Sequence, residues 1–114
     1  PLRLRQMLDN LIGNAIKYTP RGGRVQVHLH CKDSLLILQV QDNGVGIARK
    51  DQPHIFEKFY RGENIPEGTA GSGLGLAIVK SIVDSHQGRI WVESETGQGA
   101  SFFVVLPADL PVAL

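Results

Sequence analysis

Residues 35–47 read Leu-Leu-Ile-Leu-Gln-Val-Gln-Asp-Asn-Gly-Val-Gly-Ile, an apolar run that ends in a carboxylate and two spaced glycines. Leu35 to Val40 predicts a largely buried strand, and residues 42–47 predict a glycine-rich loop that lets the backbone pass close to a flat ligand. Asp42 could accept a hydrogen bond from an exocyclic amine such as that of adenine. A β-turn capped by the same carboxylate is the alternative interpretation.

The chain before this strand predicts its neighbour in a sheet. Residues 24–31 alternate, with Val25, Val27 and Leu29 on one face, which is typical of a strand. Because only a short turn, 32–34, separates the two strands, they are expected to form an antiparallel hairpin.

An amphipathic helix is predicted from about Leu2 to Tyr18, before the break at residues 19–23. Its apolar stripe consists of Leu4, Met7, Leu8, Leu11, Ile12, Ala15 and Ile16. Asn10, Asn14 and Lys17 share another side of this helix. An amide oxygen there could ligate Mg²⁺ and the lysine could reach a phosphate, although such a stripe is more often a solvated helix face.

Residues 71–76 read Gly-Ser-Gly-Leu-Gly-Leu and open a second helix. This helix is predicted to begin at residue 73 or 74 and to end near His86, with Gly88 as its cap. Free N–H groups and the helix dipole favour phosphate at such a start. Leu76 stands where a Walker loop has lysine, and the glycine spacing differs from a dinucleotide fingerprint. A helix start with incidental glycines is the alternative.

The remaining segments complete two layers. Residues 89–94 and 100–106 predict a last hairpin, 53–60 a compact apolar segment, and 62–72 a mobile polar loop. Helices on one face of a mostly antiparallel sheet give an α/β two-layer sandwich.

Composition excludes several classes of protein. The 114 residues predict one domain over 1–106 with a tail over 107–114, and a net charge of +1 without basic runs argues against a nucleic-acid partner. The single Cys31 excludes an intramolecular disulfide, and His28 and His30 lack a second cluster of zinc ligands. No apolar run reaches the ~20 residues that span a bilayer, so we expect a cytoplasmic domain without direct membrane contact.

Taken in order, these motifs resemble the catalytic domain of sensor histidine kinases. Residues 10–19 look like their N box, 42–47 like the G1 box, 55–61 like the F box and 71–78 like the G2 box. The resemblance covers Leu2 to Leu106. It implies the Bergerat ATP-binding fold, a mixed, mostly antiparallel sheet of four or five strands covered on one face by about three helices.

The resemblance also implies roles for individual residues, with ATP and Mg²⁺ as cofactors. Asp42 would bind the adenine amine and Asn14 would ligate Mg²⁺. Arg61 and residues 62–70 would form the ATP lid, for which the phenylalanines of residues 55–61 would be a packed apolar anchor. The expected nucleotide-binding residues are Asn10, Asn14, Lys17, Tyr18, Asp42, Gly44, Gly46, Ile47, Tyr60, Arg61, Gly71, Ser72, Gly73, Leu74, Gly75 and Leu76.

Other proteins share this fold. Gyrase-like and mismatch-repair ATPases usually carry a glutamate, the general base, four residues before the metal-binding asparagine. Asn10 occupies that position here, and an amide cannot accept a proton near neutral pH, so rapid hydrolysis is disfavoured. Serine kinases that bind sigma factors also share the fold, but residues 55–61 favour the histidine kinases. A non-catalytic nucleotide sensor remains an open alternative.

The partners implied by the resemblance lie outside this sequence. The family's phosphoacceptor histidine belongs to a separate dimerisation domain, usually before an acidic residue, and His28, His30, His54 and His86 lack that context. A response regulator would act downstream. We expect an excised fragment, without a short leading strand, of a parent protein that is either soluble or membrane-anchored.

Overall fold

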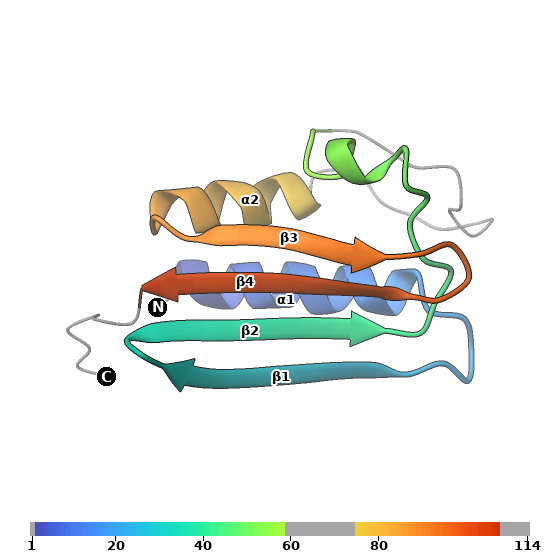
Figure 1. Cartoon of the computed structure of the whole chain (residues 1–114), viewed down its shortest axis with the longest axis horizontal. Coiled ribbons are helices and arrows are strands. Elements are labelled where there is room, and N and C mark those ends of the chain that lie inside the picture. Colours follow the sequence, from blue (N-terminus) through green and yellow to red (C-terminus); the bar gives the residue numbers. More distant parts are fainter. Residues whose placement is uncertain (1, 59–74, 108–114) are drawn as a thin grey trace.

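The computed structural model describes residues 2–58 and 75–107, which form two layers (Figure 1). Four strands make one sheet in the order β1-β2-β4-β3, and every pairing between them is antiparallel. Two α-helices cover one face of this sheet. The predicted α/β two-layer sandwich is therefore confirmed. Its elements are α1 (Leu2–Lys17), β1 (Val25–Lys32), β2 (Leu35–Asp42), the 3₁₀ helix η1 (Gln52–His54), α2 (Gly75–Ser85), β3 (Arg89–Ser94) and β4 (Ala100–Pro107).

The hydrophobic core lies between the sheet and the two helices. Alternate residues of β2 and β4 point into it, as expected for strands with one covered face. The prediction for α1 was wrong at Ile16, which is 61% exposed. Ile16 follows the buried Ala15, and one residue turns the helix by about 100°, out of the core. The core consists of Met7, Leu11, Ala15, Leu38, Val40, Val79, Ile82, Val83, Ala100, Phe102, Val104 and Leu106.

The edge strand β1 carries apolar residues that the helices do not cover. Val27 pairs with Val40 and Leu29 with Leu38, so both lie on the helix side of the sheet. They are nevertheless exposed, because α1 lies mainly over β2. The alternation of this strand was thus predicted correctly, but its burial was not. Among the described residues, no helix combines the length and the apolar character needed to cross a membrane.

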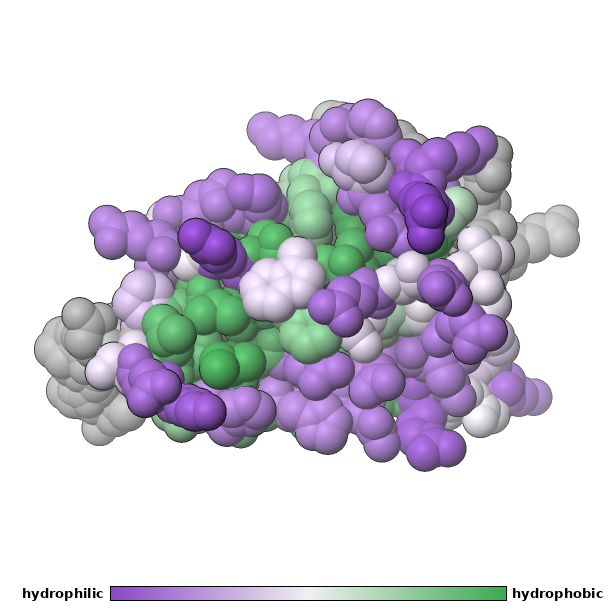
Figure 2. Space-filling model, viewed as in Figure 1, coloured by the Kyte–Doolittle hydropathy of each residue, from purple (hydrophilic) through white to green (hydrophobic). Residues whose placement is uncertain are grey.

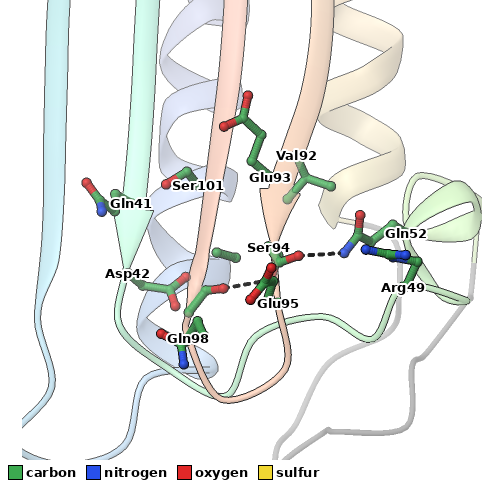
Figure 3. A pocket seen from close by; sticks show the side chains of 12 residues that line it. Gln41, Asp42, Arg49, Gln52, Val92, Glu93, Ser94, Glu95, Gln98 and Ser101 are labelled. Atoms are coloured by element: carbon green, nitrogen blue, oxygen red, sulfur yellow. Dashed lines mark hydrogen bonds between the residues drawn. The ribbon is translucent and has the colours of Figure 1, made fainter.

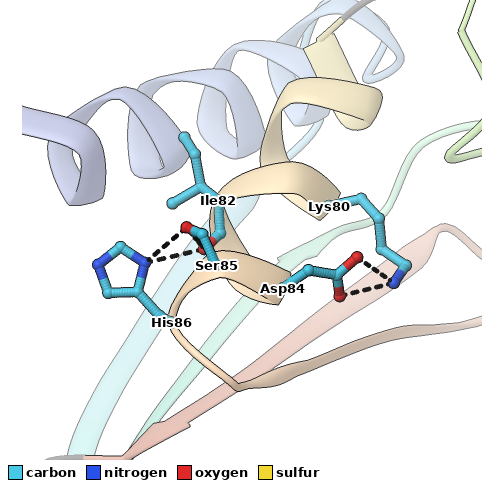
Figure 4. Close-up of polar contacts among 5 residues, drawn as sticks. All are labelled: Lys80, Ile82, Asp84, Ser85 and His86. Carbon is cyan, nitrogen blue, oxygen red and sulfur yellow. Dashed lines mark hydrogen bonds and ion pairs between the residues drawn. The ribbon is translucent and has the colours of Figure 1, made fainter.

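The C-terminal end of α2 is held by local polar contacts (Figure 4). Lys80 forms an ion pair with Asp84 one turn later, at 2.7 Å. The ring Nδ1 of His86 lies 2.8 Å from the carbonyl oxygen of Ile82. A cationic or donor group near the last carbonyls complements the helix dipole, and His86 is therefore part of the helix end.

The cap of α2 differs from the prediction by one residue. The N–H of Gly88 donates to the carbonyl of Val83 and that of Gln87 to the carbonyl of Asp84, the two bonds of a Schellman motif. The left-handed residue is Gln87, with φ of 59°. Position 88 requires glycine for a different reason, which is space: a Cβ there would overlap the side chain of Leu106.

We expect Gln87→Gly to raise the free energy of unfolding by about 0.5–1 kcal/mol, because glycine avoids the cost of the left-handed conformation but loses more entropy on folding. Urea denaturation followed by circular dichroism measures this change. Gln87→Ala is the matched control, since alanine keeps the unfavourable φ. A glycine variant no more stable than the alanine variant would contradict this account of the cap.

Candidate functional site

Three sequence-distant segments converge at one end of the sheet (Figure 1). β2 ends there at Asp42, α1 ends at Lys17, and α2 begins at Gly75. A Cβ on Gly75 would lie 3.5 Å from Oδ1 of Asn10, so the start of α2 faces the polar flank of α1. The fold thus brings together the carboxylate, the amides and the helix start that the sequence singled out.

Asp42 is a carboxylate buried at the end of β2, with 6% of its surface exposed. Its Oδ1 accepts a hydrogen bond of 2.8 Å from the N–H of Gly44, so the predicted alternative of a carboxylate-capped turn is observed. Burial raises the pKa of Asp42, although the N–H groups of Gly44 and Ala100 act in the opposite direction. A carboxylate has about four lone-pair sites. These contacts therefore leave capacity for a further donor.

We expect Asp42→Asn to stabilise the ligand-free domain near pH 7. The amide keeps an acceptor for Gly44 and removes the buried charge. Because the pKa of Asp42 is raised in the folded state, its favourable contribution is complete below the ordinary value of 3.8 and is lost as pH rises through the raised pKa. The gain in melting temperature should therefore be largest at neutral pH and shrink as pH falls toward 4. A gain independent of pH would contradict this origin.

The loop after Asp42 is fixed by contacts between main chains. The N–H of Val45 donates to the carbonyl of Tyr18, and the N–H of Gly97 donates to the carbonyl of Val45. A Cβ on Gly44 would overlap that same carbonyl of Tyr18, and one on Gly46 would overlap the carbonyl of Glu95. These glycines were predicted to allow close approach of a ligand. At the positions of their missing Cβ atoms, Gly44 and Gly46 are instead approached closely by the protein's own backbone.

The polar flank of α1 is accessible. Asn10 is half-buried, and its Nδ2 donates to the carbonyl of Gln6, which leaves Oδ1 toward Gly75. Asn14 is half-buried outside the core, and Lys17 is exposed in the last turn. Half-buried amides beside a helix start offer the oxygen ligands that Mg²⁺ takes together with phosphate.

Comparison with known proteins identifies the family of the chain. Residues 1–110 match the model of the histidine kinase-, DNA gyrase B- and HSP90-like ATPases. The chain belongs to this family, as a catalytic ATP-binding domain of the histidine kinase type.

The similar proteins are sensor histidine kinases. The domain is 46% identical over 106 residues to the sensor histidine kinase RppB of Synechocystis, covering 92% of this chain and 23% of RppB. It is 41% identical over 108 residues to WalK of Bacillus subtilis, covering 92% of this chain and 18% of WalK. It therefore spans less than a quarter of the length of these relatives.

Solved structures agree with the fold. The mycobacterial sensor histidine kinase MprB superposes with a TM-score of 0.85 at 36% identity, covering 93% of this chain and 72% of that one. Full-length ShkA, whose crystal structure is a complex with AMPPNP, gives a TM-score of 0.79 at 39% identity, covering 92% of this chain and 21% of that one.

The remaining expected site residues of the histidine kinase-type domain divide into two groups. Ile47 and Leu76 are half-buried and pack against the core. Phe56 packs edge-to-face on Phe102, with ring centroids 6.2 Å apart, which confirms the predicted packing role of this phenylalanine. Residues that lie outside the described part of the chain are Phe59, for which the same packing role was predicted, and Tyr60, Arg61, Gly71, Ser72, Gly73 and Leu74, together with the lid over 62–70.

Sequence reasoning missed the residues that brace the loop. Oγ of Ser94 accepts a bond of 2.8 Å from the N–H of Ile47 and donates one of 2.6 Å to the carbonyl of Gly99. The Gln52 amide donates to the carbonyls of Ile47 and Ser94, at 3.0 and 2.9 Å. No local sequence pattern predicts these contacts of Gln52 and Ser94, because their hydrogen-bond partners lie on separate segments.

A hollow of about 570 Å³ lies beside these braces (Figure 3). Its walls are mostly polar and come from the ends of β2, β3 and β4 and from the segment of η1. Asp42 is the one expected site residue among them, so this hollow does not coincide with the α1 and α2 flank. The lining residues are Gln41, Asp42, Arg49, Gln52, Val92, Glu93, Ser94, Glu95, Gln98, Gly99, Ala100 and Ser101.

Proposed function

We propose that this domain binds ATP with Mg²⁺ and donates the γ-phosphate to a histidine on a separate dimerisation domain, in two-component signalling with a response regulator downstream. The observation that carries the proposal is the buried carboxylate of Asp42, which lies toward the same end of the sheet as the start of α2, where Gly75 faces Asn10 of α1. Burying an ionisable group costs free energy, and such groups gather at functional sites. An adenine amine is a donor that would offset this cost.

The donor set fits ATP and Mg²⁺. Asp42 has acceptor capacity for the amine, and Asn14 offers an amide oxygen outside the core. The structure describes α2 from Gly75, and the N–H groups at the start of a helix favour phosphate. When bound, the metal would neutralise phosphate charge. The chain's own residues would hold the nucleotide at both ends and orient it, the main requirement of phosphoryl transfer.

The rival function, hydrolysis by this domain alone, lacks a general base on α1. Asn10 stands at the position expected for it, and its amide is bonded to the carbonyl of Gln6. The one acid of α1, Asp9, is exposed and lies 4.0 Å from Arg5. Transfer to a histidine needs no base of this kind on the domain, because the imidazole is itself the nucleophile.

Labelling with γ-³²P-ATP and Mg²⁺ tests the proposal. The domain alone should bind ATP and remain unlabelled, whereas a separately made helical dimerisation domain with its own histidine should gain acid-labile label at a rate that rises with concentration. Within the described residues, His28 and His30 lie on a strand, His54 contacts Glu57 at 2.8 Å, and His86 directly follows α2. Stoichiometric label on any of them would overturn the proposal. Because His54 is the histidine nearest the predicted lid, loss of label in His54→Gln would identify it as the labelled residue.

We expect Asn14→Leu to remove the dependence of ATP affinity on Mg²⁺. The change deletes the proposed ligand oxygen at a half-buried position outside the core, so the melting temperature should shift by only about 2 °C or less. Calorimetric titration of ATP with Mg²⁺ and with EDTA measures the effect. If ATP binding by the variant still required Mg²⁺, the metal would have another ligand. A large loss of melting temperature would instead make Asn14 a packing residue.

A further inference from the structure

The face of the sheet that points away from the helices carries an apolar patch (Figure 2). The outer patch comprises Leu35 and Ile37 of β2, Trp91 of β3, and Phe103 and Val105 of β4. Trp91 stacks on Phe103 with ring centroids 5.2 Å apart, and Ile37 pairs with Val105. Leu35 and Trp91 are each 39% exposed, and the other three side chains are half-buried. The patch is therefore continuous across three strands and open to solvent.

Positive charges border the outer patch on two sides. Lys32 of β1 pairs with Leu35, and Arg89 of β3 pairs with Val105. Three strand spacings separate their strands, which is about 14 Å. His28 and His30 add imidazoles on the β1 side. Among the described residues, the acids nearby are Asp33, in the β1–β2 turn, and Glu93, whose carboxylate lies 3.4 Å from the indole nitrogen of Trp91.

We propose that the outer patch is a docking surface for an amphipathic helix whose apolar stripe is flanked on both sides by acidic residues. A helix is about 10–12 Å across, which matches the space between the strands of Lys32 and Arg89. Its acids would then meet a cation on each side. A face, unlike an edge, offers no free backbone groups to an added strand, and helices are a common cover for such faces.

A second copy of this chain fits the patch less well. In such a dimer, Lys32 and Arg89 of one copy would lie near the same cations of the other copy. Few acids among the described residues lie close enough to pair with them. The exposed parts of five side chains also fall well short of the roughly 800 Å² per partner that a standard stable interface buries. Both arguments favour a short acidic element over self-association.

Fluorescence of Trp91 tests the proposal, because it is the one tryptophan of the chain. The probe is an 18-residue helical peptide with Leu at every third or fourth position and Glu on both flanks. Its control carries Lys in place of every Glu. We expect saturable binding of the Glu peptide, at least tenfold weaker binding of the Lys peptide, and weakening of the Glu peptide as salt is raised.

Two variants locate the binding. Ile37→Lys places a charge within the outer patch and should weaken the Glu peptide at least tenfold. Val27→Lys places the same charge at an exposed apolar residue on the other face and should leave it unchanged. No binding, equal binding of both peptides, or equal behaviour of both variants would overturn the proposal.

Other occupants give distinct results. A dimer in sedimentation that Ile37→Lys converts to a monomer would assign the patch to a second copy and overturn the proposal. A red shift of Trp91 emission on deletion of residues 108–114 would assign it to the chain's own end and do the same. Along β2, Leu35 lies seven residues from Asp42, about 23 Å. Ile37→Lys and Val27→Lys should therefore have equal ATP affinity. Failure of the docking proposal would then leave the proposed nucleotide site untouched, and the reverse also holds.

Discussion

Asp42→Ala should lower ATP affinity by roughly 10- to 150-fold, the largest effect of a single side chain that we expect on binding. Alanine would remove the proposed charge-assisted hydrogen bond to the adenine amine, worth about 1.5–3 kcal/mol. The same reasoning gives ATP preference over GTP, because guanine places a carbonyl where adenine has its amine, and two acceptors would then face each other. Isothermal titration with both nucleotides measures both effects.

Two controls separate recognition from folding. Asp84→Ala removes an exposed acid of α2 that is paired with Lys80 and should leave ATP affinity unchanged. Asp42→Asn keeps the bond to the N–H of Gly44 while losing the charge, so its ATP affinity should also fall although the domain is not destabilised. Equal ATP affinity of wild type and Asp42→Ala would refute the assignment of Asp42.

Gly44→Ala should have the largest effect on folding, a loss of about 2–4 kcal/mol in the free energy of unfolding, together with loss of ATP binding. The new Cβ would overlap the carbonyl of Tyr18, a backbone atom that cannot rotate away. Relieving the overlap would separate the loop from the end of α1 and break the bond from Val45 to Tyr18. Chemical denaturation and ATP titration measure the two losses.

Gly13→Ala is the matched control for that experiment. It makes the same change within α1, where a Cβ meets no atom within 4 Å. Alanine is favoured over glycine in a helix by about 1 kcal/mol, so this variant should be as stable as wild type or more so. If both glycine variants behaved alike, the close approach of Gly44 to Tyr18 would not be what fixes the loop.

The fold could be predicted from sequence where a helix or strand buries one face, because its apolar residues then recur with the period of that element. The three- to four-residue spacing in residues 2–17 located α1, and the alternation of residues 24–31 located β1, because these periods follow directly from helix and strand geometry. The apolar run of residues 35–40 located β2. The limits of the same reasoning are visible at Leu29 and Ile16. Both fit an apolar pattern, yet both are exposed, because a pattern does not state how far the covering layer extends.

The candidate site was predictable only in part, for a related reason. Asp42 follows a predicted strand and precedes two spaced glycines, so the local sequence was enough to propose it as a binding residue. Gln52 and Ser94 act through carbonyls and N–H groups of other segments, and no spacing in the sequence reports such contacts. The left-handed Gln87 was missed because glycine is the usual residue there, and the neighbouring Gly88 matched that expectation.

The main-chain contacts of the loop after Asp42 have a consequence for how the domain would respond to random mutation. Val45 is tied to Tyr18 and to Gly97 through amide and carbonyl groups alone, and these groups are the same whichever side chain is attached. In a saturation library, Val45 should therefore accept many residue types, while Gly44, Gly46 and Gly99, where a Cβ would overlap backbone, should accept almost none. Tolerance would change abruptly from one position to the next, and distance from the nucleotide would be a poor guide to it.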